Sequence, residues 1–177
     1  MKQILLFLSV FCTIGFSNAQ GIVPAGSRSM SMGNASTTFD DVWAYQNNPG
    51  ALGAITTFSA GLSYENRFLL KEFQTQGFAV AIPLKVGVIS FGGDMFGYRN
   101  YRSYQAGVGY SMKLSEKFFA GVQLNYKGLS LSSNYGSKHT ISAAAGIYAK
   151  VTENWKIGVS AYNVGRAKLS DFEDDRF

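Results

Sequence analysis

The stretch YQAGVGYSMK, residues 104–113, alternates without a break between large and small side chains. Apolar or aromatic residues occupy every second position, and glutamine, glycine, serine and lysine occupy the positions between them. Successive side chains of a β-strand point to opposite faces of its sheet. The pattern therefore predicts a strand that has one apolar face and one small or polar face.

Six further segments show the same alternation, which gives seven predicted strands in all. They occupy residues 58–65, 77–84, 89–94, 118–127, 141–150 and 155–162. Hydrophobic residues make up 46% of the chain and charged residues only 15%, below the roughly 25% of an average soluble protein. The positions between the apolar ones carry mainly Gly, Ser, Gln and Asn, which suits a filled or wet lumen better than bulk water.

We therefore predict an all-β fold, an antiparallel transmembrane β-barrel with a small N-terminal plug segment. Aromatic residues near the segment ends, such as Tyr64, Tyr126 and Trp155, fit the interfacial girdles of such barrels. The alternative is a secreted β-sandwich, whose strands alternate in the same way.

The first twenty residues read as a cleaved signal peptide. Lys2 precedes an apolar run from Ile4 to Phe16, and Ser17-Asn18-Ala19 provides a small-x-small cleavage site. The single cysteine of the chain, Cys12, lies inside this segment. Export predicts a location in the bacterial outer membrane and argues against a nucleic-acid partner, although the net charge is +5. The basic loops would instead face lipid or lipopolysaccharide phosphates.

The connections between the predicted strands alternate in length. Short turns are expected at residues 84–86, 114–117 and 152–154, and longer loops at 66–72, 95–103 and 131–138. Outer-membrane barrels have short periplasmic turns and longer outer loops. This order predicts a periplasmic N-terminus. Because closed bacterial barrels have an even number of strands, seven strands predict an incomplete barrel.

Residues 21–54 precede the predicted barrel strands (residues 55–177) and do not alternate. Asp40 and Asp41 could cap a helical turn over residues 42–45, because a carboxylate accepts hydrogen bonds from free backbone N–H groups. Asn48 and Pro49 lie in a predicted turn that joins the plug to the first strand. A second interpretation makes Asn48 and Pro49 a hinge that opens a path for an apolar ligand.

The run AGSRSMSMGNASTTFDDVWAYQNNPGALG, residues 25–53, resembles the N-terminal motif of the PorV/PorQ group of outer-membrane barrels from Bacteroidota. That group is itself similar to FadL-type long-chain fatty-acid transporters. The matching elements are the Met-x-Met-Gly-Asn-Ala run, the Asp40-Asp41 pair and Asn48-Pro49. Gly50 departs from the alanine usual in the family. The resemblance implies a barrel of about 14 strands with an N-terminal plug, of which seven would be half.

Catalytic motifs and cofactor motifs are not evident, so we expect neither an enzyme nor a cofactor. His139 is the sole histidine and has no nucleophile motif such as G-x-S-x-G to act with. The acidic residues within 171–175 could hold calcium, but their spacing does not match an EF-hand loop.

Two functions remain open. Resemblance to PorV/PorQ proteins implies a non-enzymatic accessory role related to type IX secretion, in which the barrel holds an exported protein or a partner outer-membrane protein. Resemblance to FadL-type proteins implies passive transport of hydrophobic small molecules. Phe68, Leu69 and Leu70 form the most apolar predicted loop and are candidate contacts for lipid, ligand or partner.

Overall fold

A computed structural model of the chain describes residues 26–132, 136–165 and 167. Short helices come first: α2 (Ser27–Ser31), α3 (Ala44–Asn47) and the 3₁₀ helix η1 (Pro49–Ala54). The strands are β1 (Ser59–Asn66), β2 (Gln74–Pro83), β3 (Val88–Tyr98), β4 (Tyr101–Lys113), β5 (Phe118–Leu131), β6 (Ser137–Lys150) and β7 (Lys156–Ala161). The predicted signal peptide and the acidic residues 171–175 lie outside the described residues.

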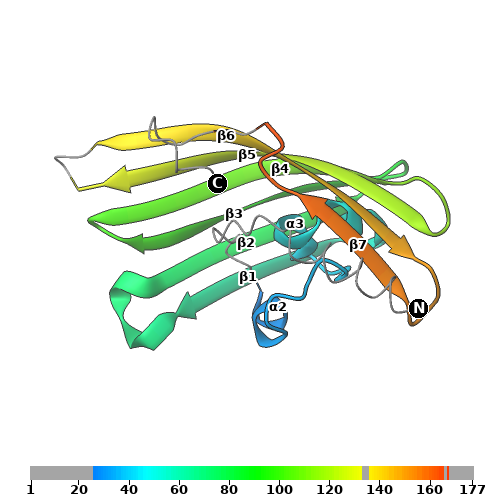
Figure 1. Cartoon of the computed structure of the whole chain (residues 1–177), viewed down its shortest axis with the longest axis horizontal. Helices are drawn as coiled ribbons and strands as arrows, with labels where there is room; N and C mark the ends of the chain where they lie inside the picture. The colour runs from blue at the N-terminus through cyan, green and yellow to red at the C-terminus, as the bar shows by residue number, and fades with distance from the viewer. Residues whose placement is uncertain (1–25, 133–135, 166, 168–177) are drawn as a thin grey trace, which may run out of the picture.

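The seven strands form one antiparallel sheet in the order β1-β2-β3-β4-β5-β6-β7, so each strand pairs with its neighbours in sequence. The sheet is curled into a half-barrel, and the N-terminal helices lie on its concave side (Figure 1). Seven strands were predicted, and the described residues contain seven. None of the helices in the described part is long and apolar enough to cross a membrane.

The two faces of the sheet carry the predicted sets of side chains. On the convex face Val108 pairs with Phe91 and Leu124, and the larger apolar side chains of this face stay exposed, 55% for Val108 and 67% for Ile141. On the concave face Ala79 and Ala81 of β2 are fully buried. The alternation of the sequence therefore separates an uncovered apolar face from a covered face of small residues.

The core lies between the concave face and the N-terminal segment, which we define as residues 26–54. Tyr45, Ala51 and Leu52 of this segment are buried against sheet residues. Phe119 of β5 and Tyr148 of β6 complete this contact, and their rings lie 5.8 Å apart.

The connections define two ends of the sheet. The connections β2–β3, β4–β5 and β6–β7 lie at one end of the sheet, which we call the turn end. The connections β1–β2, β3–β4 and β5–β6 lie at the other end, which we call the loop end. The β1–β2 loop contains two short 3₁₀ turns, η2 (Arg67–Leu69) and η3 (Lys71–Phe73).

One predicted loop is wrong. Residues 95–103 are mostly strand, because β3 continues to Tyr98 and β4 begins at Tyr101, which pairs directly with Tyr98. The aromatic rings of Phe96 and Tyr101 meet edge to face at 6.2 Å, a geometry that stabilises aromatic pairs. The aromatic and basic residues that suggested a loop therefore extend the hairpin.

Candidate functional site

The backbone of the N-terminal segment lies in direct contact with the backbone of the concave face. A Cβ atom added to Gly121 would overlap the carbonyl oxygen of Pro49, and one added to Gly146 would overlap the side-chain oxygen of Asn48. Ser111 donates a 2.6 Å hydrogen bond to the Pro49 carbonyl oxygen. Glycine and serine on the concave face therefore leave the space that η1 occupies.

Asn48 connects the N-terminal segment to the sheet. Its backbone is extended and its side chain fully buried. The amide oxygen accepts a 3.0 Å hydrogen bond from the Gly50 N–H and so caps η1. The amide nitrogen donates to the carbonyl oxygens of Thr37, at 2.8 Å, and Ile147, at 3.1 Å. Asn48 and Pro49 thus form the first turn of η1, and their role as a hinge stays a prediction.

Asp40 forms the ionic contact between the segment and the turn end. Its carboxylate lies 2.9 Å from Lys150 Nζ and 3.2 Å from Lys156 Nζ, and it accepts a 3.2 Å hydrogen bond from the Tyr148 hydroxyl. Partial burial raises the pKa of Asp40, but hydrogen bonds and attraction from the two lysines outweigh it and lower the pKa to about 2.

The two carboxylates of the predicted Asp40–Asp41 cap have different roles. Asp41 accepts a 2.9 Å hydrogen bond from the Trp43 N–H directly before α3, as predicted for a carboxylate at this turn, and it pairs with Arg28 at 3.3 Å. The helix α3 itself begins at Ala44 rather than at residue 42. Asp40 contacts Lys150 and Lys156 instead of the helix.

Further contacts hold the segment nearer the loop end. The Tyr45 hydroxyl donates a 2.9 Å hydrogen bond to the carbonyl oxygen of Gly92, and Gln46 Nε2 donates to the carboxylate of Asp94. The Tyr162 hydroxyl, beyond the end of β7, donates a 2.9 Å hydrogen bond to the Gln46 carbonyl oxygen. The segment is therefore attached to strands across the whole sheet.

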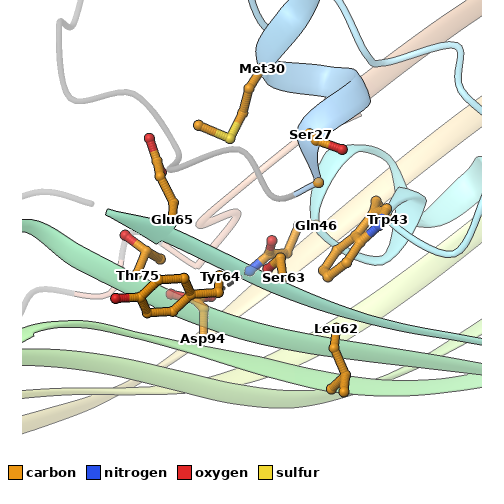
Figure 2. Close-up of a pocket in the computed structure, with 11 residues that line it drawn as sticks. Ser27, Met30, Trp43, Gln46, Leu62, Ser63, Tyr64, Glu65, Thr75 and Asp94 are labelled. Carbon is orange, nitrogen blue, oxygen red and sulfur yellow. Dashed lines mark hydrogen bonds between the residues drawn. The ribbon is translucent and has the colours of Figure 1, made fainter. Parts of the chain in front are cut away.

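A cavity of about 460 Å³ opens beside these contacts, between the segment and the first strands of the sheet. Figure 2 shows the hydrogen bond between Gln46 and Asp94 at its floor, with Glu65 and Thr75 on the sheet side. We call it the loop-side cavity, because Glu65 and Thr75 face each other near the loop end of β1 and β2.

The predicted contact residues Phe68, Leu69 and Leu70 lie apart from the other candidates, in the β1–β2 loop. Phe68 is 84% exposed and Leu69 89% exposed. Both have positive φ angles, 58° and 55°, a conformation that costs about 1–2 kcal/mol for an L-residue other than glycine. The loop therefore holds two bulky apolar side chains in solvent in a strained backbone.

His139 lies on the exposed face of β6 in a small aromatic cluster. Its Nδ1 atom is 3.1 Å from the Tyr104 hydroxyl, and its ring stacks on Tyr126 at 5.6 Å. Within residues 26–132, 136–165 and 167, no three His, Cys, Asp or Glu side chains gather in a group that could hold a metal ion.

Comparison of the chain with models of protein families, with curated proteins and with solved structures found no match in any of the three.

Sequence reasoning did not single out Gln46, Asp94, Lys150 or Lys156. The sequence did mark Asp94 as unusual, because it is a carboxylate on the small-residue face of its strand. Nothing in the sequence marked the two lysines, because lysine is common at strand ends. Each of these contacts joins residues at least 48 positions apart in the chain, so local pattern could not pair them.

The close approach of η1 to the sheet makes Gly121 sensitive to substitution. Gly121→Ala should lower the free energy of unfolding by roughly 1–3 kcal/mol, because the added methyl group displaces Pro49. The matched control is Gly165→Ala, where the added Cβ meets nothing within 4 Å. Thermal unfolding of both variants measures the difference, and equal stability would contradict the docking described for η1.

The ion pairs of Asp40 predict a response to acid. Because the pKa of Asp40 is lowered from its ordinary value of 3.8 to about 2, its contribution to stability is complete above about pH 4. It is lost as the pH falls towards about 2. The emission of Trp43, recorded in a Trp155→Phe background, should report loosening of the segment over this range. Asp40→Asn should remove that pH dependence, and an unchanged acid transition in Asp40→Asn would contradict the assignment.

Proposed function

We propose that the sheet is the membrane-spanning part of an outer-membrane β-barrel protein with a non-enzymatic accessory or binding role. The observation that carries this proposal is the opposite character of its two faces. The concave face is covered by the protein's own N-terminal segment, whereas the convex face bears a continuous set of exposed apolar side chains. A convex apolar face is what lipid requires of a barrel.

The secreted sandwich fits this arrangement less well. A sandwich buries the apolar face of one sheet against a second sheet. In the described part of the chain there is a single sheet, and the segment packed on it covers the small-residue face rather than the apolar one. An uncovered apolar face of this size marks a lipid or protein contact.

Closing the half-barrel sets a condition on its partner strands. No strand in the described residues pairs with the outer edge of β1 or of β7, and open edges are not stable in lipid. Because the antiparallel sheet has seven strands, β1 and β7 run in the same direction. Antiparallel closure therefore needs an odd number of further strands. A second copy of the sheet would supply seven strands, which is an odd number, but in the same membrane orientation its edge strands would run parallel to β1 and β7. Such a copy would therefore not give antiparallel closure.

The accessory role follows the resemblance to PorV/PorQ proteins and is supported by the β1–β2 loop. Strained backbone persists where the surrounding structure or a function maintains it. Phe68 and Leu69 have such backbone, and their side chains are almost fully exposed. We propose that this loop contacts an exported protein or a partner outer-membrane protein of a type IX secretion system.

The alternative function is FadL-like passive transport of hydrophobic small molecules past a movable segment. The loop-side cavity offers this alternative only space beside the N-terminal segment, because several of its lining residues, among them Gln46, Glu65 and Asp94, are polar. The hydrogen bonds of Asn48 and the ion pairs of Asp40 oppose it, since movement of the segment would have to break them.

The membrane position of the convex face predicts a depth-dependent cost for charge. Val108→Lys, midway along β4, should destabilise the barrel in lipid by roughly 2–4 kcal/mol. The same chemical change in the turn end, Val86→Lys, should cost little because Val86 is 73% exposed outside the strands. Denaturant titration in lipid vesicles measures both variants, and equal costs would remove the basis for a lipid-facing convex surface.

The two functions are separated by replacing the apolar loop without changing its backbone. Asparagine tolerates positive φ, so Phe68→Asn with Leu69→Asn should keep the loop conformation and remove its apolar surface. The accessory role predicts loss of the outer-membrane or exported partner from chemical cross-linking in cells, with fatty-acid uptake unchanged. The control is Leu114→Asn in a turn at the other end of the sheet. Retained cross-linking together with reduced uptake would favour transport instead.

A further inference from the structure

The loop-side cavity has the size and construction of a small-molecule site. Its volume of about 460 Å³ lies within the roughly 300–1,000 Å³ common for such sites. The N-terminal segment and the sheet both contribute to its wall, and Figure 2 shows side chains from each converging on it. Its polar and aromatic lining consists of Ser27, Trp43, Gln46, Ser63, Tyr64, Glu65, Thr75 and Asp94.

One buried polar atom at this cavity has no partner. Gln46 is only 4% exposed. Its Nε2 atom donates to Asp94, but its Oε1 atom accepts no hydrogen bond. Buried polar atoms in folded proteins are nearly always paired, so an exception requires an explanation. A ligand that donates a hydrogen bond into the cavity would supply the missing partner.

The remaining polar groups of the cavity are rich in acceptors and nearly balanced in charge. Glu65 accepts a 2.6 Å hydrogen bond from Arg67 Nε, and Lys127 is close enough to Asp94 to attract it electrostatically. Each carboxylate therefore has its own cation from the protein. A cationic ligand would find no uncompensated negative charge here, whereas a neutral donor would find several oxygen acceptors.

Trp43 adds an aromatic wall to the same cavity. Its indole ring packs over Gly61 of β1, where an added Cβ would lie 3.1 Å from the ring. A sugar ring presents C–H groups on its faces and hydroxyl groups around its rim. Such a ring can rest its apolar face on indole and donate hydroxyl hydrogens to surrounding oxygens.

From these observations we infer that the loop-side cavity binds a neutral saccharide unit. Gln46 Oε1, Glu65 and Thr75 accept its hydroxyl hydrogens, and Trp43 packs against the ring. A fatty acid fits the site poorly, because its apolar chain would leave the buried Gln46 Oε1 atom unpaired. The site lies on the loop-end side of the N-terminal segment, so the sugar enters from the loop end.

Binding is measured on the purified full chain in detergent by the emission of Trp43, in a Trp155→Phe background. The probes are maltose and chitobiose as neutral saccharides, putrescine as a cation and laurate as an apolar acid. We expect a saturable change in emission with at least one saccharide at or below about 1 mM, the weak end of specific binding.

Two variants test the assignment from opposite sides of the cavity. Gln46→Leu and Thr75→Val should each weaken saccharide binding at least about tenfold, while Gln74→Leu, which lies outside the lining, should leave it unchanged. If Gln46→Leu alters Trp43 emission without ligand, the segment has moved and Thr75→Val alone decides. Absence of any saccharide response, binding of putrescine in its place, or displacement of the sugar by laurate would overturn the inference. None of these results bears on whether the sheet spans a membrane.

Discussion

The structure depends on direct backbone contact between the N-terminal segment and the concave face of the sheet. At Gly121 and Gly146 the carbonyl oxygen of Pro49 and the side chain of Asn48 occupy the space of a Cβ atom. A curled sheet with larger residues at these positions would have no room for η1. The core of Tyr45, Leu52, Phe119 and Tyr148 forms only because this approach is possible. The small residues of the concave face thus allow the N-terminal segment to pack against it.

Polar contacts then fix where the segment lies along the sheet. Asp40 holds it at the turn end through Lys150 and Lys156, Asn48 holds its middle, and Gln46 holds it on the side of the loop end through Asp94. Contacts at the turn end, in the middle and on the side of the loop end favour a segment that stays docked. A docked segment suits the proposed binding protein better than a transporter with a moving plug. The same arrangement leaves the loop-side cavity open beside Trp43 and Gln46.

Much of the fold was predictable from the sequence, because a period of two has only one common structural meaning. The alternation in residues 104–113 gave the strand and its two faces, and six similar segments gave the strand number. The hairpin through Tyr98 and Tyr101 was missed, since aromatic residues at a strand end and in a loop look alike in sequence. The contacts of Asp40 were not predictable, because they join residues more than one hundred positions apart. The positive φ angles of Phe68 and Leu69 had no signal either, because neither residue type favours that conformation.

The proposed position of the sheet across the outer membrane is tested most directly by the accessibility of single cysteines in cells. Within these 177 residues Cys12 is the only cysteine, so Cys12→Ser removes their one thiol. A membrane-impermeant maleimide should label Leu69→Cys in intact cells and Val86→Cys only after the outer membrane is permeabilised. Val122→Cys, on the convex face, should react only after denaturation. Labelling of Val86→Cys in intact cells, or of Val122→Cys in the native protein, would contradict the account.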